Sequence, residues 1–284
     1  MSQFRPTSYR TLPPVIKNLL IINILFFLAQ YSIQSVFHID IINYLGLHYF
    51  SAERFNPLQF ITYMFLHGGF THILFNMFAL WMFGNVMENI WGGKKFLFYY
   101  LFTGIGAGLT HYIVFYFQVS PVLHNINNFL NNPSLVDFKT FIESNNFQVI
   151  SYDIQNHFNN FLTQYNNFVN SGHNSQALSL AVDFITQYKA DFLNTPVVIG
   201  ASGAVFGILL AFGMTFPNSL IYVYFAIPVK AKWFVIFYGA LELYSGFSSS
   251  DNVAHFAHLG GMLFGFILLM IWKKNQFKNH YNNF

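Results

Sequence analysis

Long apolar stretches alternate with short polar segments along most of this chain, and they predict membrane-spanning helices. A spanning helix needs roughly 20 mainly apolar residues, and six stretches approach that length. The expected spans cover about residues 19–37, 70–90, 96–117, 200–216, 233–244 and 253–272. The fourth span stops at Pro217, and the fifth contains Glu242.

A polar segment at residues 119–195 interrupts this pattern between the third and fourth spans. It is rich in Asn and Gln, yet apolar residues return every three or four positions, which predicts amphipathic helices. We expect a small helical cap that packs on itself; docking of these faces on the membrane surface or over a site is the alternative. The pattern rests on Phe138, Phe141, Ile142, Phe158, Phe161, Leu162, Tyr165, Phe168, Val169, Leu178, Val182 and Ile185.

Composition supports a membrane protein and excludes most soluble classes. Hydrophobic residues make up 54% and charged residues only 8% of the 284 residues, whereas about 25% are charged in a typical soluble domain. Cysteine is absent, which excludes disulfides, thiol nucleophiles and thiolate metal sites. The net charge is only +3, and no basic tract indicates a nucleic-acid partner. The expected fold class is an all-α membrane protein.

The basic residues distinguish the two faces of the membrane. An even number of spans places both termini on one side, and ten of the 13 basic residues then share that side. These are Arg5, Arg10, Lys17, Lys94, Lys95, Lys230, Lys232, Lys273, Lys274 and Lys278. The positive-inside rule makes this face cytoplasmic. We therefore expect a membrane domain of residues 1–118 and 196–284 with cytoplasmic termini, and an extracytoplasmic insertion at residues 119–195.

Two polar clusters lie at the outer ends of expected spans, where polar groups are costly and usually face the bundle interior. In the first, His72 and Asn76 are four residues apart and share a helix face. In the second, Ser202 lies between Gly200 and Gly203 at a helix start, where backbone amides lack helical partners and can stabilise an oxyanion. Taken alone, the first pair fits interhelical packing and Ser202 fits a helix cap.

A third cluster, in the sixth span, places a histidine beside small residues. Gly261 and Gly265 form a Gly-x-x-x-Gly face that lets another helix approach closely, and His258 lies three residues before it. If this face meets the small residues of the fourth span, Ser202 comes next to His258. His255 is the alternative base, but the glycine spacing favours His258.

Together these motifs resemble those of rhomboid intramembrane serine proteases. They occur in the family's order: His-x-x-x-Asn at His72 and Asn76, Gly-x-Ser-Gly around Ser202, and His-x-x-Gly-x-x-x-Gly beginning at His258. The family fold is a six-transmembrane-helix bundle, which agrees with the number of spans expected from the charges.

The resemblance implies an endopeptidase that cuts transmembrane proteins near the outer membrane face through a Ser–His dyad. Ser202 corresponds to the nucleophile and His258 to the general base. His72 and Asn76 correspond to side chains that stabilise the oxyanion. Phe206 falls where the family has an aromatic residue against the catalytic histidine. The supporting positions are Gly200, Gly203, Phe206, Gly261 and Gly265.

The same resemblance limits what else is expected at the site. The family's dyad has no orienting acid, so we expect a catalytic role for neither Glu242 nor Asp251. His67 matches a recurrent family position with a structural role. No metal or organic cofactor is expected, because the histidines lack a convincing set of partner ligands. The expected partners are transmembrane protein substrates and membrane lipid.

Two other classes of function remain open. A catalytically inactive rhomboid-like protein that binds membrane clients would typically lack the serine or the histidine, and both are present. A transporter or channel would show paired broken helices or ionisable residues along several spans, and these are scarce. An intramembrane protease is the leading hypothesis, and the absence of an organellar targeting segment is compatible with a bacterial inner membrane.

Overall fold

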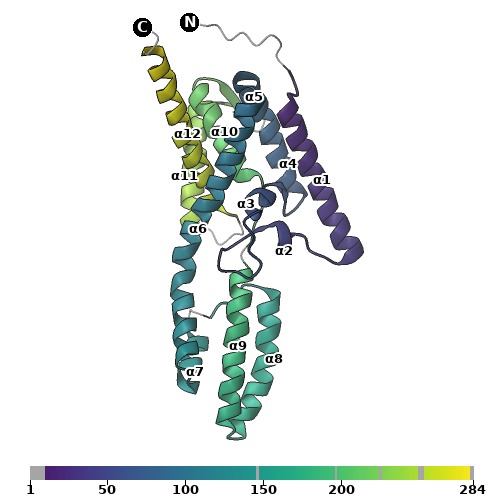
Figure 1. The fold of residues 1–284 in the computed structure, drawn as a ribbon, viewed down its shortest axis with the longest axis vertical. Helices are drawn as coiled ribbons and strands as arrows, with labels where there is room; N and C mark the ends of the chain where they lie inside the picture. The colour runs from purple at the N-terminus through teal and green to yellow at the C-terminus, as the bar shows by residue number, and fades with distance from the viewer. Residues whose placement is uncertain (1–9, 145–146, 196, 224–225, 249–252, 282–284) are drawn as a thin grey trace. The chain divides into compact units, whose positions relative to one another are not determined.

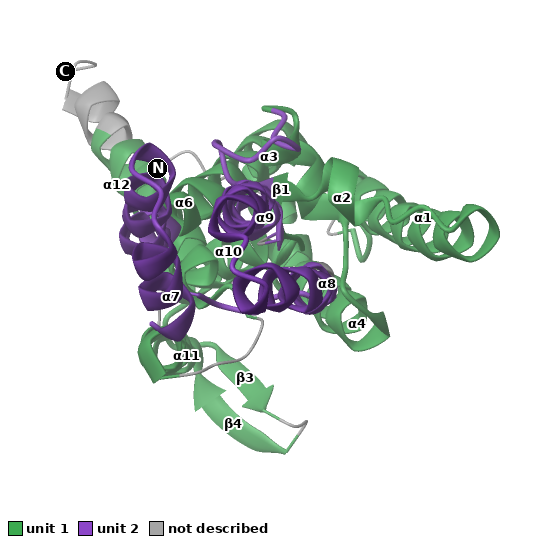
Figure 2. Cartoon of the chain, turned by 90° about the horizontal axis from the view of Figure 1, so that it is seen from below, with its two compact units in different colours: residues 1–47, 57–112, 198–284 green, residues 48–56, 113–197 purple. Residues whose placement is uncertain are grey.

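A computed structural model describes most of the chain, and nearly all of its regular structure is helical (Figure 1). The described residues are 10–144, 147–195, 197–223, 226–248 and 253–281, so Arg5 and Asp251 lie outside them. The chain forms two compact units (Figure 2). Unit 1 comprises residues 1–47, 57–112 and 198–284, and unit 2 comprises residues 48–56 and 113–197.

The N-terminal half of unit 1 begins with a long helix whose start is held by a buried acid. Helix α1 (Pro14–Phe37) has proline at its first position, where a missing N–H costs nothing. The carboxylate of Glu88 accepts hydrogen bonds from the amides of Val15 at 2.9 Å and Ile16 at 2.7 Å. There follow α2 (Ile42–Leu45), α3 (Gln59–Thr62), the 3₁₀ turn η1 (Tyr63–Phe65), α4 (Phe70–Ala79), the π-helical turn η2 (Leu80–Gly84) and α5 (Asn85–Trp91).

Helix α6 (Gly93–Asn131) is longer than the expected third span. Its 39 residues continue well past residue 117, so the expected insertion boundary at residue 119 falls inside a helix. The reason is a change of pattern rather than a helix stop: Val122, Ile126 and Phe129 are buried at helical spacing. The expected span covers only the continuously apolar residues 96–117, whereas the helix continues beyond them with one apolar face.

The C-terminal part of unit 1 contains three helices and a hairpin. They are α10 (Ser202–Thr215), β3 (Leu220–Val223), β4 (Ile227–Lys230), α11 (Ala231–Ser248) and α12 (His255–Tyr281). Helix α10 ends two residues before Pro217, as the sequence predicts. The strands β3 and β4 pair antiparallel, with Leu220 opposite Lys230, and they connect α10 to α11.

Four segments of the described chain are long and apolar enough to cross a membrane. They are Pro14–Phe37, Phe70–Trp91, Gly93–Asn131 and His255–Lys274. Helix α10 is also apolar but has only 14 residues. Large apolar side chains such as Leu25, Phe75 and Phe237 are more than half exposed, which is unusual for a surface in water. These features are those of an all-α membrane protein.

Small residues bring α10 and α12 together backbone to backbone. A Cβ atom added to Gly261 would overlap the carbonyl oxygen of Gly203, and one added to Gly265 would lie 3.4 Å from the Cα of Gly207. The hydroxyl of Tyr99 donates to the Gly207 carbonyl at 2.9 Å. This close approach places the first turn of α10 beside the first turns of α12.

Unit 2 is a helical module with an aromatic core of its own. It contains the end of α6 together with α7 (Leu135–Glu143), α8 (Tyr152–Asn170) and α9 (Asn174–Asn194). Ser134 and Ser151 cap α7 and α8, each accepting a backbone N–H through its side chain. Phe184 of α9 stacks on Phe161 of α8 at 4.4 Å. The boundaries between the units fall after residues 47, 56, 112 and 197; the first and last of these lie in the two-residue strands β1 (Leu47–His48) and β2 (Val197–Val198).

Candidate active site

Ser202 is the first residue of α10, and the turn before it is fixed by Gly200. Gly200 has φ +120°, a conformation that glycine adopts without a steric penalty. Its N–H donates to the carbonyl of Tyr63 at 2.9 Å, and the Tyr63 hydroxyl donates to the carbonyl of Gly104 at 2.7 Å. These bonds hold the entry to α10 and thereby the position of Ser202.

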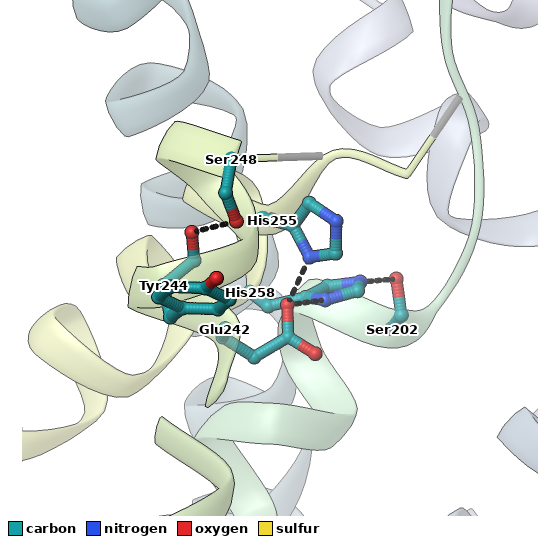
Figure 3. Close-up of polar contacts among 6 residues, drawn as sticks. All are labelled: Ser202, Glu242, Tyr244, Ser248, His255 and His258. Atoms are coloured by element: carbon teal, nitrogen blue, oxygen red, sulfur yellow. Dashed lines mark hydrogen bonds and ion pairs between the residues drawn. The ribbon is translucent and has the colours of Figure 1, made fainter. Parts of the chain in front are cut away.

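His258 lies in the first turn of α12 and faces Ser202. Its Nε2 is 2.8 Å from the Ser202 Oγ (Figure 3). The ring of Phe206 stacks on the imidazole, with the centroids 4.3 Å apart and the planes 5° from parallel. His258 is 8% exposed. A serine and an imidazole at hydrogen-bond distance have the geometry of a nucleophile and its base.

His72 and Asn76 lie on one face of α4 and supply hydrogen-bond donors. The amide of Gly68 donates to His72 Nδ1 at 3.2 Å, so the ring hydrogen of the neutral imidazole is on Nε2. The His72 Nε2 and the Ser202 Oγ border the same space beside Gly200: a Cβ atom added to Gly200 would lie 2.8 Å from this Nε2 and 3.6 Å from this Oγ. Asn76 is buried, and its Nδ2 has no hydrogen-bond partner among the described residues. Such donors suit an oxyanion.

His67 packs behind His72 in the loop before α4. It is fully buried, its ring meets that of His72 edge to face at 5.0 Å, and the Gln30 side chain donates to its carbonyl at 3.0 Å. Burial, together with the nearby His72, lowers the pKa of His67 to about 3. The ring is therefore neutral at neutral pH and occupies a structural position.

Glu242, for which no catalytic role is expected from the sequence, contacts the His258 ring. Its Oε2 is 2.8 Å from the Nδ1 of His258 and 2.8 Å from the Nδ1 of His255 (Figure 3). Glu242 is 7% exposed. Thus an acid contacts the side of the His258 ring opposite Ser202. Sequence spacing gave no signal for this contact, because Glu242 belongs to α11 and both histidines to α12.

The same three side chains form a group whose ligand atoms lie within 4.8 Å of one another. This differs from the expectation that the histidines lack partner ligands. Atoms that bind one tetrahedral zinc ion are separated by about 3.3 Å, whereas the 2.8 Å separations from the Glu242 oxygen are those of direct hydrogen bonds. The observed geometry is therefore that of a carboxylate accepting from two imidazoles.

Comparison with known proteins identifies one family and distant relatives. The Rhomboid domain family matches residues 54–120 and 167–275. Rhomboid-like protein 11, chloroplastic, of Arabidopsis thaliana is 33% identical over 98 residues, which are 30% of this chain and 35% of that protein. Rhomboid protease GluP of Bacillus subtilis (strain 168) is 34% identical over 55 residues, which are 19% of this chain and 11% of that protein. Each match thus covers about a third or less of the relative.

Proposed function

The chain belongs to the rhomboid family, and from this premise we propose that it is an intramembrane serine endopeptidase. The observation that carries the proposal is the 2.8 Å contact between the Ser202 Oγ and the His258 Nε2. The proposed substrates are transmembrane proteins, cut near the outer face of the membrane.

The proposed reaction is acyl transfer from a peptide to Ser202. His258 Nε2 takes the hydroxyl proton as the Ser202 Oγ attacks the peptide carbonyl, and then gives this proton to the leaving amine. A water molecule hydrolyses the acyl-enzyme with His258 again as the base. The proposed oxyanion donors are His72 Nε2, Asn76 Nδ2 and the backbone amide of Ser202, since the first amides of a helix have no partner within it.

The proposal includes six membrane crossings, with α10 and α11 added to the four long apolar segments. The 14 residues of α10 extend about 21 Å, less than the roughly 30 Å of the hydrocarbon core. Ser202, at the outer end of α10, then lies below the outer surface, where water can reach it from outside. The proposed location is a bacterial inner membrane, although one relative is named as chloroplastic.

Reaction with a fluorophosphonate probe, followed by mass-spectrometric identification of the modified residue, tests the proposal. Wild-type protein in detergent should be labelled at Ser202, and Ser202→Ala should not be labelled at that position. Loss of the base in His258→Ala should slow the reaction by several orders of magnitude, since removing either residue costs on the order of 10⁶ in a soluble serine protease.

Thermal unfolding of each variant provides the control for folding. If wild-type protein with a cooperative transition is not labelled, the protease proposal is wrong and an inactive family member that binds clients is favoured. Cleavage of a transmembrane protein by Ser202→Ala at the wild-type rate would contradict it equally.

A further inference from the structure

We propose that Glu242 is a positioning residue that makes Ser202, His258 and Glu242 a hydrogen-bonded triad; this inference rests on the protease function proposed above. The three side chains come from α10, α12 and α11. The Ser202 Oγ and the Glu242 Oε2 each lie 2.8 Å from a different nitrogen of the His258 ring. Both His258 and Glu242 are buried.

The hydrogen bonds determine which tautomer of His258 is present. A carboxylate only accepts hydrogen bonds, and here one oxygen receives two imidazole nitrogens (Figure 3). Nδ1 of His258 must then carry the hydrogen, and Nε2 must be the free acceptor for the Ser202 hydroxyl. This is the tautomer that a general base needs; the other one would present N–H to the serine.

Glu242 also compensates the charge that develops during the reaction. When the Ser202 proton moves to Nε2, His258 becomes a cation while its other hydrogen stays on Nδ1. A cation buried away from water is costly unless an opposite charge is close, and the carboxylate supplies that charge at 2.8 Å. The proton later leaves Nε2 for the amine as the C–N bond breaks, so Glu242 itself is never protonated.

His255 keeps the carboxylate in place. It lies three residues before His258 in α12, and its Nδ1 donates to the same Oε2 at 2.8 Å. Glu242 is therefore held from two successive positions on one face of α12. The second contact restricts rotation of the carboxylate and keeps its oxygen aligned with His258.

The test compares the same Glu→Gln change at two buried carboxylates. Glu242→Gln keeps the shape but removes the charge beside His258. Glu88→Gln removes the charge of the acid that caps α1. Glu88 takes no part in the triad. For each protein, the rate of inactivation by a fluorophosphonate is measured against probe concentration, which separates the chemical step (kinact) from probe binding (KI).

We expect Glu242→Gln to lower kinact about 10²- to 10⁴-fold with KI nearly unchanged, as loss of the acid does in soluble triads. Glu242→Asp keeps the charge and should recover part of kinact. Glu88→Gln should lower the unfolding temperature without changing the kinact of the folded protein. A lowered kinact with an unchanged KI is not expected from a carboxylate that only stabilises the fold.

Four outcomes would overturn or remove the basis of this inference. A wild-type kinact in Glu242→Gln contradicts the triad. So does a decrease in labelling that is fully explained by unfolded protein, as judged against Glu88→Gln. Loss of wild-type labelling on treatment with EDTA would assign the three side chains to a metal instead. Failure of the wild-type protein itself to react at Ser202 would reject the protease function and the triad with it. This outcome differs from a wrong triad alone, in which the wild-type protein and Glu242→Gln react at the same rate.

Discussion

At the scale of single residues, a flat aromatic neighbour restrains the His258 ring. The parallel contact with Phe206 at 4.3 Å is of a type that contributes about 0.5–1.5 kcal/mol. Phe206→Ala removes this surface and lets the imidazole turn away from Ser202, so the rate of fluorophosphonate reaction should fall about 2- to 10-fold. Phe206→Tyr keeps the ring and should react like the wild type. An unchanged rate in Phe206→Ala would show that stacking does not orient His258.

Burial of His67 makes stability depend on pH. Its pKa is lowered to about 3 in the folded protein, against about 6.5 in an unfolded chain. Between these values only the unfolded chain binds the proton. The free energy of unfolding therefore decreases as pH falls from about 6.5 toward 3, by at most about 1.4 kcal/mol per pH unit from this group. Denaturant unfolding between pH 6.5 and 4.5 should show a shallower decrease in His67→Gln. Equal slopes in the two proteins would contradict this account.

Spacing within one helix predicts some residues of the candidate active site, and contacts between helices explain the others. His72 and Asn76 are four residues apart, so any helix places them on one face. The pairing of Ser202 with His258 needed the additional assumption that small residues bring two helices together. Nothing in the chain links Glu242 to His258, because their contact depends on how α11 lies against α12. An acid on a neighbouring helix is recognised only from the structure.

At the scale of secondary-structure elements, the contact between α10 and α12 leaves no room for a side chain at Gly261. A Cβ atom there meets the carbonyl of Gly203, which is backbone and cannot turn aside. Gly261→Ala must separate the helices, so we expect a loss of roughly 1–3 kcal/mol in stability. Because the shift moves His258 relative to Ser202, the folded fraction should also react more slowly with a fluorophosphonate.

The matched control for this change is Gly239→Ala in α11. Its Cβ atom would lie 3.3 Å from the terminal methyl carbon of Met262, the far end of a flexible side chain that can move. Its stability and reaction rate should stay near wild type. If Gly261→Ala and Gly239→Ala behave alike, close backbone packing does not position the site.

Element boundaries follow from the sequence where a residue stops a helix, and are missed where the pattern only changes. Pro217 forces α10 to end nearby, and the observed end at Thr215 agrees. No comparable stop follows the apolar part of α6. Polar residues there are compatible with a helix as long as one face is buried, and Val122 and Ile126 provide that face. Hydropathy alone therefore marks the end of the apolar part of α6 and not the end of the helix.

At the scale of the whole molecule, the site and the aromatic cluster of residues 138–192 lie in different compact units. The site residues all belong to unit 1, and the hydrogen bonds and ring contacts described for them are made within it. Unit 2 has a separate aromatic cluster in which Phe184 packs against Phe161 at 4.4 Å and Phe158 at 5.7 Å. Stability of one unit should therefore be separable from the chemistry of the other.

Phe184→Ala tests this separation, because it removes a buried ring from the centre of unit 2. The cavity should cost about 3–5 kcal/mol, enough to expose residues 135–194 to limited proteolysis, while fluorophosphonate labelling of Ser202 should stay within about 2-fold of wild type. Tyr152→Ala, at a residue that is 79% exposed, is the matched control and should leave both readouts unchanged. Parallel loss of labelling and protease resistance in Phe184→Ala would mean that the two units unfold as one.

With labelling preserved, a changed rate of cleavage of a transmembrane protein would assign unit 2 to substrate selection, and an unchanged rate would leave it without a part in catalysis.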